Sequence, residues 1–220
     1  MFIPGSTMSV AKTELIAVRH GETEWNAENR MQGYADISLS NRGLRQARAV
    51  AAALAAERLH AVYSSDLQRA FQTAQAINAH HQHRIQADVR LREIHLGVFE
   101  GLTRDEALSR YGGAYDQFFF SDGTFALPAG ESRRQLQQRV DEFLHETVSR
   151  HVGERILIVT HGGVLIGVLR HALAIPVEVA FRAKLYNAAI NRFYFENGKW
   201  FLGQWGDRHH LDGLETVGVI

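Results

Sequence analysis

The chain of 220 residues contains no cysteine, which excludes disulfides, thiolate catalysis and cysteine-ligated metal centres. It also lacks an excess of charge, because 24 Lys and Arg residues balance 24 Asp and Glu residues. Nucleic-acid-binding and membrane-surface proteins bind through a net basic field, so this balance argues against nucleic acid and membrane as partners. An anionic ligand would have to be held by a local group of positive side chains.

Long apolar runs are missing as well. No stretch reaches the roughly 18 consecutive apolar residues that span a bilayer. The N-terminal segment MFIPGSTMSVAKT also lacks the basic and then apolar parts of a secretory signal. We interpret residues 1–13 as a flexible N-terminal tail, in which either Met1 or Met8 could be the start, and we expect a cytoplasmic protein. Residues 14–220 are long enough for a single domain with a large core.

Short apolar runs alternate with longer helical patterns, which is typical of an α/β fold with a mainly parallel sheet. Strands are expected at 15–18, 61–65 and 155–160, with a short extended stretch in 85–94. Helices are expected from Ser38 or Ser40 to Leu59, at 67–80 with Asp66 as the cap, at 131–151 and at 163–175. The strand at 155–160 is the most apolar and β-branched, so we place it at the centre of the sheet.

Two further segments have their own character. Residues 96–130 are rich in glycine and aromatic side chains, and we interpret them as a loop-rich excursion over the sheet edge that sets specificity. Residues 189–205 have the form of a β-hairpin with Asn197-Gly198 as its turn. An exposed edge of this hairpin could pair with a second copy of the chain, so a homodimer is one expectation.

Charged and histidine side chains stand where apolar runs end. Arg19 and His20 follow the first strand, and His161 follows the strand at 155–160. Arg69, early in the helix after the strand 61–65, and Glu93, at the end of the extended stretch, occupy equivalent places. In open α/β sheets ligands bind beyond the carboxyl ends of the strands. The sequence therefore predicts that these five side chains meet in one pocket.

Such a group of side chains is suited to phosphoryl chemistry. Arginine forks give bidentate contacts to phosphate oxygens, and a neutral imidazole is a good nucleophile toward phosphorus. A helix that begins near Gly162 would point its free N–H groups at the same anion. A carboxyl such as Glu93 can protonate the leaving oxygen. No P-loop and no HExxH motif is present, and we interpret HHQHR at 80–84 as a solvated helix end rather than a metal site.

Five motifs in order carry a family resemblance: RHGETEWN, SSDLQRAFQTA, LREIHLGVFEG, PAGES and VTHGG. Together they resemble the histidine phosphatase superfamily, the phosphoglycerate-mutase-like proteins, from about Leu15 to Asn191. The resemblance implies a three-layer α/β/α sandwich with a largely parallel central sheet and a small inserted cap, about 96–130, in a single domain over 14–220. It also implies that no metal and no cofactor is required.

The resemblance further implies a role for each matching residue. His20 would be the nucleophile that becomes phosphohistidine, Glu93 the acid/base, and His161 a second histidine that helps to bind the phosphoryl group. Arg19 and Arg69 would complete the phosphate clamp. The remaining positions that match the pocket are expected to bind substrate: Asn26, Gln32, Gly33 and Gly162.

The details of the motifs favour the phosphatase branch. Cofactor-dependent mutases of this family tend to read ERHYG and HGN where this chain reads EIHLG and HGG, and residues 111–130 contain no Lys or Arg for a second phosphate. Our first hypothesis is a metal-independent phosphomonoesterase acting on a small-molecule phosphate ester. The alternative is a cofactor-dependent phosphoglycerate mutase, which needs a 2,3-bisphosphoglycerate primer. The third is a non-catalytic phospholigand-binding protein, which would be expected to have lost at least one of the five clustered residues.

Overall fold

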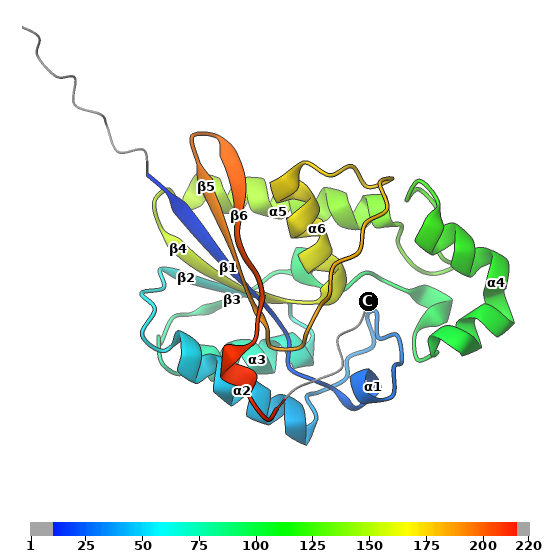
Figure 1. Ribbon diagram of the computed structural model, residues 1–220, viewed down its shortest axis with the longest axis horizontal. Helices are drawn as coiled ribbons and strands as arrows, with labels where there is room; N and C mark the ends of the chain where they lie inside the picture. Colours follow the sequence, from blue (N-terminus) through cyan, green and yellow to red (C-terminus); the bar gives the residue numbers. More distant parts are fainter. Residues whose placement is uncertain (1–10, 215–220) are drawn as a thin grey trace, which may run out of the picture.

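A six-stranded sheet with the order β3-β2-β4-β1-β5-β6 forms the centre of the computed structural model, which describes residues 11–214 (Figure 1). The parallel strands are β1 (Thr13–Arg19), β2 (Ala61–Ser64), β3 (Ile85–Ala87) and β4 (Arg155–Thr160). The antiparallel strands are β5 (Ile190–Glu196) and β6 (Lys199–Asp207). The expected largely parallel sheet with β4 near its centre is confirmed. Residues 15–18 of β1 and 156–159 of β4 are buried, as these unbroken apolar runs require.

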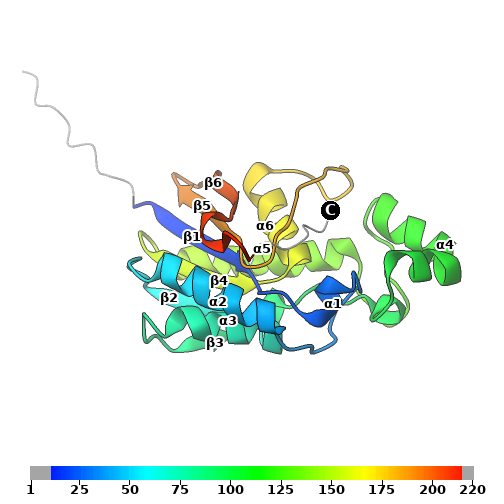
Figure 2. The ribbon, with the colours of Figure 1, turned by 60° about the horizontal axis from the view of Figure 1, so that its bottom comes forward.

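Helices cover both faces of the sheet. Helices α2 (Asn41–Leu54) and α3 (Gln68–Asn78) pack on the face that presents Ile16 and Val18, and Figure 2 shows them lying across it. Helices α5 (Arg133–Arg150) and α6 (Gly162–Leu173) pack on the opposite face, which presents Leu15 and Ala17. Alternate residues of β1 therefore pack into two separate hydrophobic cores, one on each face of the sheet. The expected three-layer α/β/α sandwich is confirmed.

Two sequence predictions at helix ends are wrong. The helix expected to run to Leu59 ends at Leu54, because the chain must straighten before β2, where the His60 N–H donates to the Arg155 carbonyl at 2.9 Å. Asp66 does not cap α3. It forms a two-point ion pair with Arg92 instead, at 2.7 and 2.5 Å.

The first N–H groups of α3 find other partners. The Gln68 N–H donates to the Asp36 carboxylate at 2.7 Å, and the Leu67 N–H donates to Ser65 Oγ at 3.2 Å. Asp36 lies far from this helix in the sequence, so local spacing could not identify it as the cap.

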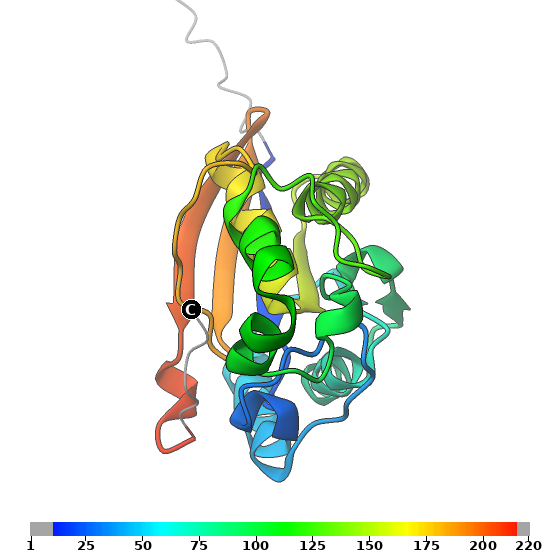
Figure 3. The ribbon, with the colours of Figure 1, turned by 90° about the vertical axis from the view of Figure 1, so that its right-hand side faces the viewer.

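The segment 96–130 is largely helical rather than loop-rich, which corrects the sequence prediction. Its main element is α4 (Arg104–Phe120), which begins with a Thr103–Glu106 capping box and is interrupted at Tyr111, where φ is −140°. Figure 1 places α4 at the side of the molecule toward which the parallel strands run, and Figure 3 shows it in front of the sheet. The aromatic side chains divide: Phe118 is buried in the core and Phe120 is exposed. Gly112 and Gly113 weaken the helical pattern, which misled the prediction.

The remaining elements are short. They are α1 (Glu24–Ala27) and the 3₁₀ turns η1 (Val89–Leu91), η2 (Gly97–Phe99) and η3 (His209–Leu211). The expected hairpin is confirmed, and Asn197 and Gly198 both adopt positive φ in its turn. Most of the expected tail, residues 1–10, lies outside the described residues, and β1 begins at Thr13. None of the helices within 11–214 has the length and hydrophobicity needed to cross a membrane.

Candidate active site

His20 follows directly after β1 and is almost fully buried. Its Nδ1 lies 2.7 Å from the carbonyl oxygen of Gly21. A carbonyl can only accept, so Nδ1 carries the proton and the neutral ring keeps a free lone pair on Nε2. Burial, together with the positive charges of Arg69 and Arg19, lowers the pKa of His20 well below 6.5. At neutral pH the ring is therefore an uncharged base whose Nε2 can attack an electrophile.

His161 follows β4 and faces His20, with the ring centroids 5.0 Å apart. Arg69 Nε donates to His161 Nδ1 at 3.2 Å, so the proton of the neutral ring is on Nε2, which donates to Ser65 Oγ at 2.8 Å. Burial and the charge of Arg69 lower the pKa of His161 well below 6.5. The second histidine is thus fixed in one tautomer by partners on both of its nitrogens.

Two buried guanidinium groups supply the positive charge. Arg69 is inaccessible to solvent, and its Nη1 and Nη2 donate to the carbonyls of Ala35 and Gly33 at 2.7 and 2.8 Å. Burial lowers the pKa of Arg69 to about 10, so it stays a cation at neutral pH. Arg19 Nη1 donates to the Leu185 carbonyl at 3.1 Å, while its buried Nε has no partner. A buried cation with a free donor is suited to an anionic ligand.

Glu93 enters the site from the segment after β3, and its carboxylate sits at the N-terminus of α6. Its Oε1 accepts hydrogen bonds from the N–H groups of Ile94 and Gly163, at 2.8 and 2.9 Å. A Cβ at residue 163 would lie only 2.4 Å from this oxygen, so the close approach requires glycine. A Cβ at Gly162 would lie 3.6 Å from Oε2 and 3.9 Å from Arg19 Nε, so the second carboxylate oxygen and the free arginine donor both border Gly162.

The structure brings all five clustered residues of the sequence prediction together, although their roles stay predictions. The four expected substrate-binding residues differ in how directly they join this group. The Gly33 carbonyl holds Arg69, and Gly162 adjoins Glu93 and Arg19. Asn26 is linked to the His20 carbonyl through Asn187, whose Nδ2 lies 3.0 Å from that carbonyl and 3.3 Å from Asn26 Oδ1.

Gln32, the fourth of these residues, is buried, and its Oε1 accepts from Thr23 Oγ1 at 3.1 Å. Thr23 also caps α1 and bonds to Asn26. Gln32 and Asn26 are therefore joined through one hydroxyl next to the His20-Gly21 turn.

Sequence reasoning missed several residues that hold the site. Thr73 accepts the Gly21 N–H at 3.0 Å and donates to the Arg69 carbonyl at 2.8 Å. Ser65 could have been noticed as a polar side chain at the end of a strand. Asn187 and Leu185 lie at least 166 positions from the residues they contact, His20 and Arg19, and no local pattern marks them.

The arrangement as a whole is a buried group of positive side chains around an uncharged histidine. Two fixed cations and the N-terminus of α6 can stabilise negative charge on a transferring phosphoryl group without reorganisation. Within residues 11–214, no cluster of three or more His, Cys, Asp or Glu side chains is placed to hold a metal ion.

Comparisons with known proteins agree with this site. Phosphoglycerate mutase-like protein 4 of Arabidopsis thaliana is 40% identical over 203 residues, which cover 90% of this chain and 87% of the relative. The metal-independent phosphoserine phosphatase of the same plant is 39% identical over 206 residues, covering 92% and 84%. The solved structure of Bacillus stearothermophilus YhfR superposes with a TM-score of 0.84 at 36% identity, covering 90% of this chain and 99% of that one.

The sequence also matches a family as a whole, over residues 15–208. That range contains both strand-end histidines, both buried arginines and Glu93. With the fold and the five expected motifs in place, the chain belongs to the histidine phosphatase superfamily (branch 1).

Proposed function

We propose that this enzyme is a metal-independent phosphomonoesterase that hydrolyses small-molecule phosphate esters through a phosphohistidine at His20. The observation that carries the proposal is the contact between His20 Nδ1 and the Gly21 carbonyl, which leaves the lone pair of Nε2 free inside a buried group of cations. A phospholigand-binding protein would not need a histidine held in its nucleophilic tautomer.

In the first step, Nε2 of His20 attacks phosphorus and the bond from phosphorus to the ester oxygen breaks. Arg19 Nε and the guanidinium of Arg69 stabilise the charge that builds on the equatorial oxygens. Glu93, carrying a proton on Oε2, gives that proton to the departing alkoxide. The products are an alcohol, a phosphohistidine and a Glu93 carboxylate.

In the second step, a water molecule attacks the phosphorus of the phosphohistidine. The Glu93 carboxylate takes a proton from this water, and the bond between Nε2 and phosphorus breaks with its electron pair returning to the ring. Inorganic phosphate leaves, and His20 and Glu93 are restored to their first states. Fixed cations supply the stabilisation that a metal ion supplies in other phosphatases, so we propose that no metal or other cofactor takes part.

The names of the relatives favour two kinds of reaction, hydrolysis and phosphoryl transfer within a phosphoglycerate. A metal-independent phosphoserine phosphatase is among them, which favours a phosphorylated small molecule with an alcohol leaving group. Another relative carries the name phosphoglycerate mutase-like, so the mutase alternative stays open. Residues 111–130, which include half of α4, contain no Lys or Arg. This lack of basic side chains favours hydrolysis over retention of a second phosphate.

Two further expectations stay proposals. A cytoplasmic location fits the absence of cysteine, and fractionation of cells tests it. A homodimer through the hairpin of β5 and β6 would use the sheet edge at β6, where Phe201 and Leu202 are partly exposed. Sedimentation of the purified protein tests this second proposal.

The experiment that tests the proposed function follows hydrolysis and isomerisation together. The protein, in excess EDTA, is given 4-nitrophenyl phosphate, phosphoserine, or 3-phosphoglycerate with and without 2,3-bisphosphoglycerate. We expect phosphate release without isomerisation, a phosphorylated His20 peptide by mass spectrometry, and no turnover by folded His20→Ala. Primer-dependent isomerisation faster than hydrolysis would establish the mutase instead, and full activity of His20→Ala would refute both.

A further inference from the structure

Glu93 lies in a segment without regular hydrogen-bonding partners. It follows η1 and belongs to neither a helix nor a strand, so no ladder fixes its position. Yet an acid/base group must be held within a fraction of an ångström to transfer a proton efficiently. The contacts that hold this segment therefore decide how well Glu93 can act.

One side chain holds most of this segment. Arg139, on α5, donates through Nη1 to the carbonyls of Arg90 and Arg92, at 2.6 and 2.7 Å, and through Nη2 to the carbonyl of Glu93 itself, at 2.9 Å. Thr160 Oγ1 binds the intervening carbonyl, that of Leu91, at 2.7 Å. The four consecutive carbonyls of residues 90–93 thus all accept hydrogen bonds from side chains of other elements.

Glu131 completes the arrangement from the other side. Its Oε1 and Oε2 accept from Arg139 Nη2 and Nε, at 2.6 and 3.1 Å, so every N–H of the guanidinium has a partner. The same Oε1 accepts the N–H of His95 at 2.9 Å, and the Glu131 N–H donates back to the His95 carbonyl at 2.9 Å. Arg139 and Glu131, which we call the Glu93 clamp, therefore hold the backbone on both sides of Glu93 through hydrogen bonds.

The contact of Glu131 with Arg139 and the backbone of His95 explains the residues of the PAGES motif. Two glycines allow its backbone to touch the Glu93 segment: a Cβ at Gly130 would lie 2.6 Å from the His95 carbonyl oxygen, and one at Gly97 would lie 2.1 Å from the Pro128 carbonyl oxygen. The last residue of the motif, Ser132, caps α5 through the Gln135 N–H. The motif therefore seats Glu131 against the segment and starts the helix that carries Arg139.

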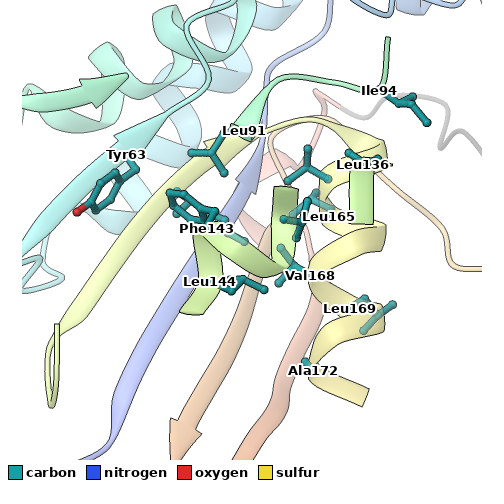
Figure 4. Packing of buried hydrophobic residues seen from close by; sticks show 14 of the residues in the cluster. Tyr63, Leu91, Ile94, Leu136, Phe143, Leu144, Leu165, Val168, Leu169 and Ala172 are labelled. Atoms are coloured by element: carbon teal, nitrogen blue, oxygen red, sulfur yellow. The ribbon is translucent and has the colours of Figure 1, made fainter. Parts of the chain in front are cut away.

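Apolar packing around the Glu93 clamp restricts the movement of its residues. Leu91 and Ile94, on either side of Glu93, are buried, and Figure 4 shows them beside the side chains of α5 and α6, with Ile94 next to Leu136. Arg139 and Glu131 are themselves only 14% and 16% exposed, which keeps solvent from competing for their bonds. Such a shielded ion pair with all donors used holds a geometry well.

We propose that Arg139 and Glu131 are positioning residues for the acid/base Glu93, and that they act on proton transfer to the leaving group without touching the substrate. This inference rests on the proposed function, because it takes Glu93 as the acid. Loss of the clamp would let the carboxyl group drift from the leaving oxygen. The nucleophile His20 and the arginines Arg19 and Arg69 are held by other contacts and would keep their places.

The test uses two esters of similar shape that differ in their need for an acid. The 4-nitrophenolate of 4-nitrophenyl phosphate leaves without a proton, whereas the alkoxide of 4-nitrobenzyl phosphate needs one. The value of kcat/KM reports the steps up to phosphorylation of His20, so later hydrolysis does not enter it. Both esters are followed by phosphate release with wild type, Glu93→Gln, Arg139→Met and Glu131→Gln.

We expect Arg139→Met to lower kcat/KM for the benzyl ester by about 10- to 100-fold and to leave the aryl ester within about threefold of wild type. Glu93→Gln should show the same selectivity more strongly, and Glu131→Gln a weaker form of it. The double variant Glu131→Gln/Arg139→Met should lose little beyond Arg139→Met, because both residues act through one clamp. Arg150→Met, which removes an exposed arginine paired with Glu146 at the far end of α5, is the matched control and should change neither ester.

The outcomes separate the two proposals. A selective Glu93→Gln with an Arg139→Met that lowers both esters equally would overturn the positioning role, because a merely less stable protein loses both activities together. An unselective Glu93→Gln would refute the acid role on which the proposed function depends. Where Arg139→Met does not fold, Arg139→Lys, which keeps the charge but not the fork, is read in the same way.

Discussion

His20 and His161 face each other across the site with their ring centroids 5.0 Å apart, and their protons are on opposite nitrogens. The Gly21 carbonyl keeps the proton of His20 on Nδ1, and Arg69 Nε keeps that of His161 on Nε2. Two like rings are thereby given different capacities. The first offers a lone pair on Nε2, and the second is fixed between Arg69 and Ser65.

The buried histidines make stability depend on pH. In the folded state the pKa values of His20 and His161 lie well below 6.5, so the unfolded chain binds more protons as the pH falls below about 6.5. The free energy of unfolding should therefore decrease as the pH is lowered through this range, by up to about 1.4 kcal/mol per pH unit for each histidine. Urea denaturation between pH 7.5 and 5.5 measures this slope. His20→Gln and His161→Gln should each reduce it, and an unchanged slope in both would contradict the assignment.

Arg69→Lys tests the shape of the proposed phosphate clamp rather than its charge. Lysine keeps the positive charge but cannot bond Ala35, Gly33 and His161 from one planar group. We expect kcat/KM to fall about 100- to 1,000-fold for aryl and alkyl esters alike, and inhibition by orthovanadate to weaken in parallel. Circular dichroism confirms that the variant is folded. Retention of normal vanadate inhibition would show that the fork geometry of Arg69 does not matter.

Gly163→Ala should damage catalysis although it favours the helix. Alanine is the better helix former, but its Cβ would lie 2.4 Å from Glu93 Oε1 and displace the carboxyl group. We expect kcat/KM for 4-nitrobenzyl phosphate to fall about 10- to 100-fold with little loss of thermal stability. Gly162→Ala provides the comparison, since the one tight contact of its Cβ would be with the end of the flexible Leu185 side chain, at 3.3 Å, and Glu93 Oε2 would lie at an ordinary contact distance of 3.6 Å. Equal effects of the two substitutions would argue against Glu93 as the reason for glycine at residue 163.

Glu14→Gln should weaken the scaffold and spare the chemistry. Glu14 lies at the start of β1, at the other end of the strand from His20, and bonds Arg155 and Arg192 at 2.6 and 2.7 Å. Burial tends to raise the pKa of Glu14, but the bonds to the two arginines outweigh it and lower the pKa below 4.5. We expect a loss of about 1–3 kcal/mol at pH 7, after allowance for solvent screening, with kcat unchanged.

The sign of this effect follows from linkage. A carboxylate whose pKa is lowered in the folded state stabilises the protein above about pH 4.5, and that contribution disappears as the pH falls through the folded pKa. The difference in unfolding free energy between wild type and Glu14→Gln should therefore shrink in acid. A difference that stays constant from pH 7 to pH 3 would mean that the charge of Glu14 is not what stabilises the protein.

Strand patterns and strand-end residues were readable because their causes are local. The unbroken apolar runs before Arg19 and His161 require burial on both faces, and parallel strands deliver their ends to one edge. The predictions that failed have two different causes, a partner outside the local window and glycines inside a helix. Asp66 is a residue type that often caps helices, but here its carboxylate pairs with Arg92 instead. The glycines within α4 weaken the helical pattern of its sequence.

The sequence by itself determined the α/β class, the two histidines at strand ends and the five motifs, because alternation, burial and glycine turns are encoded within short windows. Only the tertiary structure decided which nitrogen of each histidine carries the proton, why residue 163 must be glycine, and how Arg139 and Glu131 hold Glu93. Most of these features arise from contacts between groups far apart in the chain, and even the local contact of His20 with Gly21 takes its geometry from the packed elements around it.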